Sequence, residues 1–485
     1  MPESAPVQLT NTLSRRVEPL EPISPGEIKL YTCGPTVYNF AHIGNFRSFL
    51  FADVLRRVLE YNGYKVHQVR NITDVGHLTN DELGTGIDKI EASARAQNMA
   101  PLDLASYYTD AFLADARRLN LLEPEQSPKA TDYVPSMIQL IERLIAEGYA
   151  YESHGSVYFE VSKFPGYGRL SGNSVDDLIA GSRVEIEDGK RAPADFALWK
   201  AAGPDKLMRY PSPWGEGVPG WHVECSAMAM DLLGDEIDIH TGGEDHVFPH
   251  HEDEIAQSEA ATGKPFARLW MHGAFLQLPK PETAGEGEKM SKSSGKVFLV
   301  QDMVDRGIHP LAYRYFTFEA HYRTPQTFSW EALEGAQNAL RGMWEAVALL
   351  HQESAEVEEP GMAATEYQRQ FLEAINRDLD VPGAVAVAHA VIRSKLPPGQ
   401  KLALLYDFDR VLGLDLEIMA RRLSEITPEQ QGMIDERAKA RAAKDFARSD
   451  ALRDGLAQAG VEVRDTPMGQ RWIRRDVFAQ AAPVA

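Results

Sequence analysis

Residues 27–72 read EIKLYTCGPTVYNFAHIGNFRSFLFADVLRRVLEYNGYKVHQVRNI, and this stretch decides the fold. Residues 27–33 are typical of a buried strand that ends in a Gly-Pro turn. From Asn45 onward, apolar side chains recur at helical spacing until an Asn-Gly pair ends the helix. Residues 66–72 then indicate a second strand. Strand, helix and strand in about 45 residues form a βαβ unit, which predicts a parallel sheet with a right-handed crossover.

Ligands of such sheets bind beyond the carboxyl ends of the strands. Cys33 and the loop at residues 34–44 occupy such an end. The tetrapeptide HIGN, from His42 to Asn45, lies directly before the predicted helix. Backbone amides and the dipole of a helix N-terminus attract polyphosphate, and Gly44 lets a nucleotide approach the backbone closely. These residues therefore predict a nucleotide turn, although tetrapeptides of this kind also occur by chance.

The composition is that of a globular protein with several domains. The chain has 485 residues, too many for one hydrophobic core, and about three domains are expected. Apolar residues make up 44% and charged residues 25%, which is ordinary for a soluble protein. No apolar run of about 18 residues predicts a membrane helix, and residues 1–16 do not resemble a secretion signal. We therefore expect a cytoplasmic protein without a membrane partner.

The charge is unevenly distributed along the chain. A net charge of −21 argues against a nucleic-acid binder, because phosphate contacts need Lys and Arg. In residues 427–485, however, ten basic side chains accompany nine acidic ones. This asymmetry permits a nucleic-acid surface at the C-terminus. On charge alone, a neutral and solvated pair of helices is the simpler interpretation.

The chain has only two cysteines, Cys33 and Cys225, which excludes a disulfide scaffold and fits a reducing compartment. Two unrelated buried thiols would be the ordinary interpretation. His250 and Glu254, however, are four residues apart in a helical context and face the same side. Zinc accepts thiolate, imidazole and carboxylate together. The four residues thus predict a zinc site, with a polar helix N-terminus as the alternative for the His and the Glu.

A loop rich in Pro, Gly and Glu, residues 279–295, contains KMSKS from Lys289 to Ser293, with Lys292 as the second lysine. Two lysines and several hydroxyls next to a mobile segment could close over the charged phosphates of a transition state and bind them. A charged loop tip is the alternative for a pentapeptide of this kind. The Gly-x-x-x-x-Gly-Lys-Ser/Thr sequence does not occur, which excludes a P-loop enzyme.

The nucleotide turn, the zinc-type cluster and the lysine loop follow one another in the order that resembles class I aminoacyl-tRNA synthetases. Over nearly its full length, the chain resembles the cysteinyl-tRNA synthetase family. The matching text is YTCGPTVYNFAHIGNFR, VRNITDVG, GWHVECSAMAM, DIHTGGEDHVFPHHEDEIAQSEA, EKMSKSSGK, AYRYF and KARAAKDFARSDALRDGLAQAGVEVRD. The GWHVECS and FPHHEDE blocks are highly specific to this family.

The expected fold class is α/β. The resemblance implies a Rossmann-type parallel-sheet catalytic domain with an inserted connective domain, followed by a helical bundle and a small α/β anticodon-binding module. The expected division is 1–126 for the first half of the catalytic domain, 127–214 for the connective insertion, 215–278 for the second catalytic half, 279–329 for the lysine-loop and stem-contact region, 330–425 for the bundle and 426–485 for the module.

The resemblance implies one zinc ion per chain, which binds the thiolate of the substrate L-cysteine. Its ligands map to Cys33, Cys225, His250 and Glu254. Zinc favours a thiolate over an alcohol, so cysteine would be selected over serine without an editing site. Other positions that line the cysteine and adenylate site map to Gly34, Thr73, Trp221 and Asp245. Asp245 would hold the substrate ammonium.

ATP with Mg²⁺ is the implied co-substrate. The ATP-binding positions map to His42, Gly44, Asn45 and Lys292, and the catalytic ones to His42, Lys289 and Lys292. The cysteine carboxylate would attack the α-phosphorus and release pyrophosphate. The 3′-terminal ribose hydroxyl of tRNA(Cys) would then attack the adenylate carbonyl.

Positions that touch anticodon bases in the family map to Arg441, Phe446, Asp450 and Asp465. Arginine reads base edges or stacks, an aromatic ring stacks on a splayed base, and a carboxylate accepts from exocyclic amines. A surface or capping role is the alternative for both aspartates. A monomer is the family expectation.

The chain departs from the family pattern at Asn45, where many class I enzymes have a second His; Asn cannot carry a charge. The segments 74–77 and 294–296 also differ from the family pattern. Two alternatives stay open. One is a ligase that joins cysteine to an amino-sugar and would not need an anticodon module. The other is a non-catalytic RNA-binding relative, which only Asn45 supports.

Overall fold

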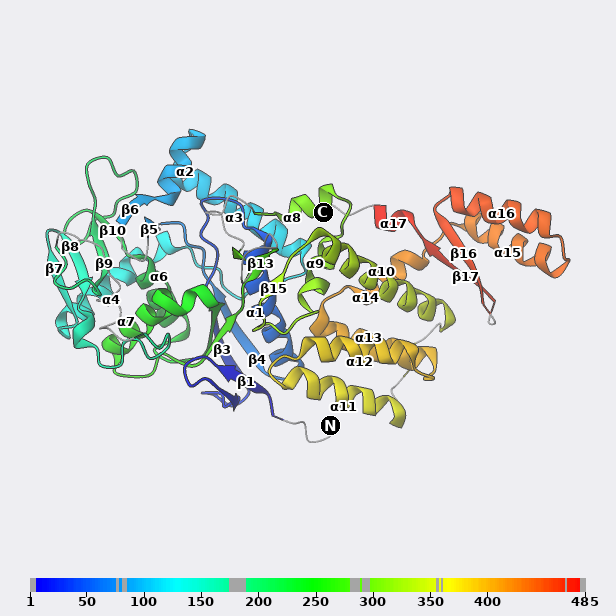
Figure 1. The fold of residues 1–485 in the computed structure, drawn as a ribbon, viewed down its shortest axis with the longest axis horizontal. Coiled ribbons are helices and arrows are strands. Elements are labelled where there is room, and N and C mark those ends of the chain that lie inside the picture. The colour runs from blue at the N-terminus through cyan, green and yellow to red at the C-terminus, as the bar shows by residue number, and fades with distance from the viewer. Residues whose placement is uncertain are drawn as a thin grey trace.

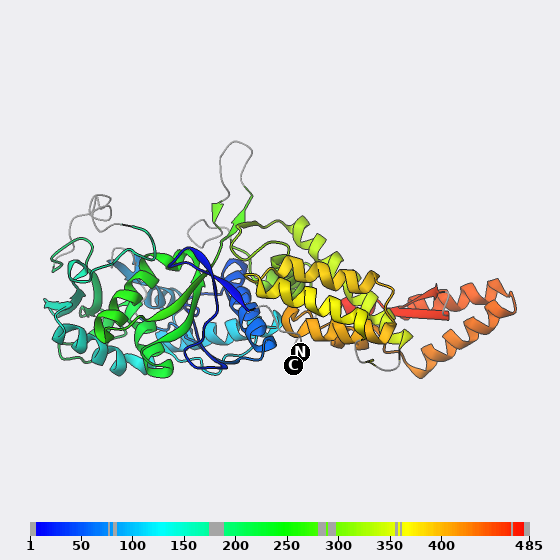
Figure 2. The same cartoon turned by 90° about the horizontal axis from the view of Figure 1, so that it is seen from below.

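The computed structural model describes residues 6–75, 78–80, 85–173, 189–279, 288–289, 297–354, 357–358, 361–466 and 469–479. Three bodies follow one another along the long axis of the molecule (Figure 1). They are an α/β body, a helical bundle and a small C-terminal module of helices and a hairpin. The view from below shows the same arrangement (Figure 2).

A four-stranded parallel sheet forms the centre of the α/β body, in the order β12-β11-β3-β4. Its strands are β3 (Glu27–Thr32), β4 (Lys65–Arg70), β11 (Ile237–Gly243) and β12 (Ala267–Gly273). Helix α1 (Ile43–Tyr61) connects β3 to β4, so the expected βαβ unit is present. Ile239 pairs with Leu30 on one side and Leu269 on the other, and all three are buried. The predicted Rossmann-type α/β fold is therefore confirmed.

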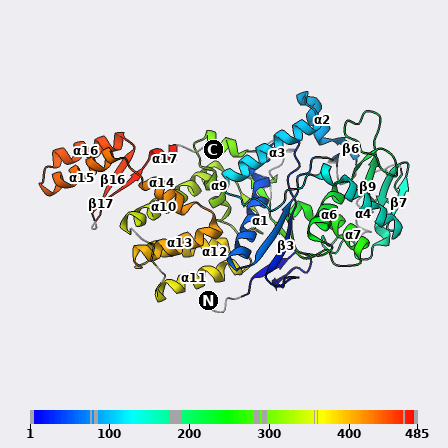
Figure 3. The same ribbon diagram turned by 180° about the vertical axis from the view of Figure 1, so that it is seen from behind.

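Helix α1 lies between the sheet and the bundle, with α6 (Trp221–Leu233) and α7 (Glu252–Thr262) beyond the sheet (Figure 3). Its apolar side chains Phe46, Leu50, Val54 and Val58 recur every four residues and are buried. A helix with this spacing presents a continuous apolar face. A short hairpin, β1 (Gln8–Asn11) and β2 (Arg16–Pro19), lies beside β12.

Between β4 and α6 the chain forms a second sheet, which is antiparallel and has the order β10-β9-β8-β7. Its strands are β7 (Ala150–Ser153), β8 (Ser156–Phe159), β9 (Phe196–Ala201) and β10 (Gly217–Pro219). Helix α4 (Val134–Ala146) packs against β7 and β10. The same part of the chain includes β5 (Leu78–Asn80), β6 (Thr85–Asp88), α2 (Lys89–Gln97), α3 (Pro101–Arg118), η2 (Ala130–Tyr133) and η3 (Val161–Lys163).

The bundle begins where the Ser329 hydroxyl accepts from the Ala332 N–H at 3.1 Å and caps α10. Its helices are α10 (Trp330–Glu353), α11 (Met362–Asn376), α12 (Val381–Arg393), α13 (Pro398–Leu412) and α14 (Leu416–Ser424). Phe371 and Phe408 stack at a centroid distance of 4.0 Å and join α11 to α13. The elements between sheet and bundle are β13 (Leu276–Leu278), β14 (Glu288–Lys289), α8 (Val300–Asp305), α9 (Pro310–Thr317) and β15 (Gln326–Thr327).

The C-terminal module has its own small core of Ile434, Leu456, Val461 and Val463. Its elements are α15 (Pro428–Ala442), α16 (Phe446–Gln458), β16 (Val461–Thr466), β17 (Gly469–Arg474) and α17 (Asp476–Ala479). Ion pairs attach the module to the bundle: Glu345 of α10 pairs with Arg464 at 2.7 Å and also with Arg475. Among the helices of the described residues, none has the length and apolarity to cross a membrane.

Candidate metal centre and active site

Two cysteines that are far apart in the sequence meet at the carboxyl end of the parallel sheet. Cys33 directly follows β3, and Cys225 lies on α6. His250 comes from the turn η5 (Val247–His251), and Glu254 from the first turn of α7. All four side chains are buried, and their donor atoms lie within 4.8 Å of one another. The four residues singled out in the sequence thus form one cluster.

The distances in this cluster match the edges of a tetrahedral zinc site. Zn–S bonds of about 2.3 Å place two sulfurs about 3.8 Å apart, and Cys33 Sγ lies 3.9 Å from Cys225 Sγ. A sulfur–oxygen edge is about 3.6 Å, and Cys33 Sγ lies 3.7 Å from Glu254 Oε1. His250 Nε2 lies 3.1 Å from the same oxygen, near the expected nitrogen–oxygen edge of about 3.3 Å. Both thiols are free, so the donor set fits a zinc ion.

Electrostatics in the cluster also suit a cation. Burial raises the pKa of Cys33. Burial opposes ionisation of Cys225 too, but the hydrogen bond with Cys33 and the interaction with His250 lower its pKa to about 6. Burial disfavours the charged form of His250, yet Glu254 and Cys225 raise its pKa to about 10. Burial likewise opposes ionisation of Glu254, but His240 and His250 lower its pKa. A divalent cation would displace the protons held on Cys33 and His250.

Two further histidines contact two of the four donors, Glu254 and His250. His240 Nε2 lies 2.9 Å from Glu254 Oε2, and His222 Nδ1 lies 2.8 Å from His250 Nδ1. Partners of this kind fix the tautomer and direction of a metal-ligating side chain. The sequence showed that histidines are abundant around Cys225, but their spacing assigned no role to His222 or His240. Only the fold reveals which ring touches which donor.

A second set of donors overlaps the first. Cys33, His240, His251 and Glu254 also lie within 4.8 Å of one another. This set contains one thiol instead of two. Because soft thiolates favour zinc, the set with both cysteines is the better candidate.

The nucleotide turn forms the N-terminus of α1. His42 Nδ1 accepts from the Asn45 N–H at 3.2 Å, and Asn45 Oδ1 accepts from the His42 N–H at 3.1 Å. This reciprocal cap starts the helix at Ile43, two residues before the start that the apolar pattern indicates. Gly44 lies in the first turn. Asn45, where many class I enzymes have a second His, thus holds the turn in shape.

Two of the predicted substrate residues are joined next to Cys33. The Gly34 N–H donates to Asn71 Oδ1 at 2.8 Å, and Asn71 Nδ2 donates to Thr73 Oγ1 at 3.0 Å. A Cβ at Gly34 would lie only 1.5 Å from the Asn71 carbonyl oxygen, so this position requires glycine. These contacts hold the end of β3 against the segment that follows β4.

Trp221 contacts the cluster, and Asp245 lies near it in the sequence. The Trp221 ring lies against that of His250, with centroids 4.5 Å apart. Asp245 lies in η4 (Glu244–His246), directly before the turn that carries His250, and its side chain is exposed. Gly34, Thr73, Trp221 and Asp245 therefore come from four separate segments around one edge of the sheet.

Most of the lysine loop, including Lys292, lies outside the described residues. Glu288 and Lys289 form β14, which pairs antiparallel with β13 and places Lys289 opposite Gln277. Because β13 follows β12 after two residues, β14 pairs next to the carboxyl end of β12, at the edge of the sheet that carries the cluster.

In the C-terminal module, Asp465 is held by two arginines. Arg437, which is fully buried, donates to both carboxylate oxygens at 2.9 and 3.0 Å, and Arg441 lies 3.2 Å away. The hydrogen bond from Arg437 lowers the pKa of Asp465. Phe446 is 60% exposed although it is a large apolar side chain. Asp450 lies 3.7 Å from Arg453. The sequence did not single out Arg437, because a buried arginine on α15 gives no local signal.

Comparisons with known proteins agree with this architecture. Residues 19–338 match the family "tRNA synthetases class I (C) catalytic domain", and residues 423–472 match the "Cysteinyl-tRNA ligase anticodon binding domain". The chain is 44% identical to a cysteine--tRNA ligase of Novosphingobium aromaticivorans, with 97% of each chain covered. It is 43% identical to one of Thermus thermophilus, covering 95% of this chain and 98% of the relative.

A solved structure of Mycobacterium tuberculosis methionyl-tRNA synthetase in complex with methionyl-adenylate shares the fold. Its TM-score is 0.55 and its sequence identity 16%, with 87% of this chain and 96% of that chain covered.

Proposed function

We infer, from the premise that this chain belongs to the cysteinyl-tRNA synthetase family of class I aminoacyl-tRNA synthetases, how it selects its amino acid. The protein is a ligase that joins cysteine to tRNA. We propose that it recognises cysteine with a zinc ion held by Cys33, Cys225, His250 and Glu254. The observation that carries this proposal is the tetrahedral spacing of the four buried donors. When bound, the zinc would supply a centre that prefers a thiolate to an alcohol.

The protein groups have distinct roles in this proposal. Trp221 closes the amino-acid site over His250, and Asp245 holds the ammonium of cysteine. Gly34 and Thr73 shape the floor of the site next to Cys33. In the nucleotide turn, His42 and Gly44 hold ATP, which enters with Mg²⁺, and Asn45 keeps the turn in shape. Lys289 and Lys292 stabilise the charge that develops on the phosphates as the cysteine carboxylate attacks.

The C-terminal module argues against the first of the two alternatives. A ligase that joins cysteine to an amino-sugar would not need residues 423–472, which match an anticodon-binding domain. A non-catalytic RNA-binding relative rested on Asn45 alone, and this residue caps α1. We propose tRNA(Cys) as the tRNA partner, with Arg441, Phe446, Asp450 and Asp465 at the anticodon. The proposed working form is a cytoplasmic monomer, divided into the six segments predicted from the sequence.

Metal analysis combined with ATP–pyrophosphate exchange tests the zinc proposal. The purified protein is expected to hold about one zinc per chain, and exchange is expected to depend on L-cysteine. Removal of the metal with a chelator should abolish exchange, and added Zn²⁺ should restore it. Full exchange activity in metal-free protein would contradict the proposal.

Phe446→Ala is expected to weaken tRNA charging without affecting cysteine activation. Stacking of a base on an aromatic ring contributes about 1–3 kcal/mol, which corresponds to a loss of about 5- to 150-fold in kcat/KM for tRNA(Cys). Pyrophosphate exchange should stay at the wild-type rate. Met362→Ala, which removes another exposed apolar side chain from α11, is the matched control. Equal losses in both assays would show that Phe446 acts through folding.

A further inference from the structure

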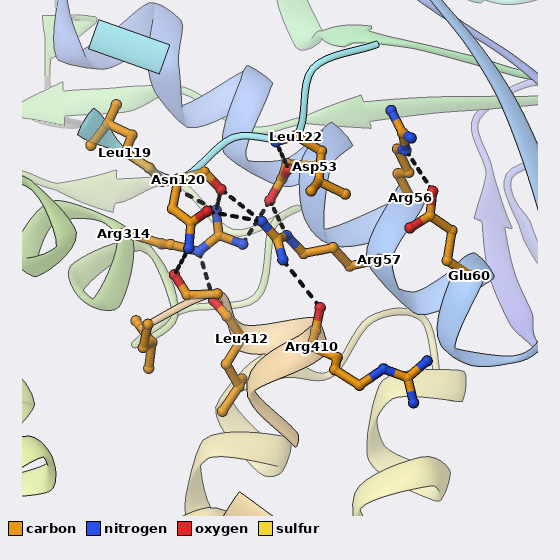
Figure 4. Close-up of polar contacts among 12 residues, drawn as sticks. Asp53, Arg56, Arg57, Glu60, Leu119, Asn120, Leu122, Arg314, Arg410 and Leu412 are labelled. Carbon is orange, nitrogen blue, oxygen red and sulfur yellow. Dashed lines mark hydrogen bonds and ion pairs between the residues drawn. The ribbon is translucent and has the colours of Figure 1, made fainter. Parts of the chain in front are cut away.

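A buried polar network joins the α/β body to the bundle (Figure 4). It consists of Asp53 and Arg57 on α1, Asn120 after α3, Arg314 on α9, and the carbonyl of Leu412 at the end of α13. We call these five residues the Arg314 joint. None of them belongs to the catalytic or anticodon positions described above.

Arg314 is the centre of the joint and is completely buried. Its Nη2 donates to Asp53 Oδ2 at 2.6 Å, and its Nε donates to the Leu412 carbonyl at 2.6 Å. Its Nη1 reaches the carbonyls of Leu119 and Asn120 at 3.3 and 3.1 Å. One guanidinium therefore connects three parts of the chain. Its planar fork of donors makes this possible, since a lysine ammonium could not serve all of these directions.

Asp53 has further partners within the α/β body. It also accepts from Arg57 Nε at 2.8 Å and from the Leu122 N–H at 2.7 Å. Burial alone would raise the pKa of Asp53, but Arg314 and Arg57 lower it. A buried carboxylate with these partners is ionised and has a fixed direction. The α1 side of the joint is thus fixed.

The bundle side fits Arg314 closely. Gly413 follows α13 with φ of +60°, and a Cβ there would lie 2.8–3.1 Å from the guanidinium. Asn120 Nδ2 donates to the Gly413 carbonyl at 3.0 Å and to Asp415 Oδ1 at 2.8 Å. The turn between α13 and α14 is therefore seated directly on the guanidinium and on Asn120.

Helix α9 also contacts the nucleotide turn. The Tyr313 hydroxyl donates to the Ile43 carbonyl at 2.6 Å, in the first turn of α1. The adjacent residue Arg314 contacts the middle of the same helix and the end of α13. One short helix thus ties the N-terminus of α1, which carries the ATP-binding turn, to the bundle that carries the anticodon module.

We propose that Arg314 is a positioning residue for the transfer step: it fixes the bundle relative to α1, so that a tRNA held at the C-terminal module presents its 3′-end to the adenylate. The inference rests on the proposed function, because it assumes anticodon contacts at the module. It concerns transfer alone. Adenylate formation uses groups at the sheet edge, so we expect it to be much less sensitive than transfer to the angle of the bundle.

Arg314→Lys tests this proposal. The lysine keeps the charge opposite Asp53 but cannot also donate to the Leu412 carbonyl. We expect kcat/KM for charging of tRNA(Cys) to fall about ten-fold or more, while pyrophosphate exchange with cysteine stays within about two-fold of wild type. Proportional losses in both assays, or no loss in either, would overturn the proposal. Absence of tRNA charging by the wild-type enzyme would instead refute the proposed function.

Arg369→Lys is the matched control, because it makes the same substitution elsewhere in the bundle. Arg369 is exposed on α11 and pairs with Glu366 and Glu373 of the same helix. This variant should leave both activities near wild type. A double-mutant cycle with Phe446→Ala adds a second readout. If Arg314 acts by placing a tRNA held at the module, the two losses will be less than additive. Full additivity would show that Arg314 acts independently of the module.

Discussion

Cys225→Ser is expected to lose zinc and cysteine activation together. The hydroxyl that replaces the thiol is a poor zinc ligand, and it leaves one vertex of the tetrahedron without a donor. Changing only the residues that hydrogen-bond to a metal ligand lowers metal affinity or activity about 10- to 100-fold. Loss of a ligand itself should therefore lower kcat/KM for cysteine in pyrophosphate exchange by more than about 100-fold. The preference for cysteine over serine, expected at about 10⁴ or more in the wild type, should fall with it. Metal content and exchange with both amino acids measure these effects.

Ala229→Ser is the control for this variant. It places the same hydroxyl one turn further along α6, at another buried position, and should leave metal content unchanged. If Cys225→Ser retained a full complement of zinc, Cys225 would be a core thiol and the amino-acid specificity would need another explanation.

Lys292→Ala is expected to slow adenylate formation by about 10²- to 10³-fold, because a positive charge aimed at developing phosphate charge is among the largest catalytic contributions. The loss should appear in the rate of pyrophosphate exchange at saturating cysteine and ATP. Transfer of cysteine from adenylate already formed to tRNA should be nearly normal, since that step no longer involves the pyrophosphate leaving group.

Lys296→Ala removes the same charge four residues later, directly after the loop, and serves as the control. Equal losses in the two variants would mean that the loop contributes only a general positive field. A loss confined to Lys292→Ala supports a specific contact with the nucleotide.

The parts of the fold that follow local rules could be predicted from the sequence. Apolar spacing and an Asn-Gly stop located α1 and its flanking strands to within two residues at most ends. The start of α1 was missed because His42 and Asn45 exchange hydrogen bonds, and a histidine cap has no strong sequence signal. Convergence of Cys33 with Cys225 was expected from the chemistry of the donors, and the sheet brings them together.

Contacts between distant segments could not be predicted in this way. His240 on β11 lies 2.9 Å from Glu254 on α7. No spacing rule in the sequence encodes how this strand and this helix are placed relative to each other. Arg314 and Asp53 are 261 residues apart. Their neighbours in the sequence are mainly apolar and buried, and this pattern does not say which distant charge either residue meets, so the ion pair can be found only once the tertiary packing is known.

The attachment of the C-terminal module has a consequence for its response to salt. The arginines that pair with Glu345 remain about one-third exposed, whereas Arg314 is fully enclosed. Counter-ions screen the first contact and cannot enter the second. Rising ionic strength is therefore expected to weaken the ion pairs of Glu345 before it affects the contacts of Arg314.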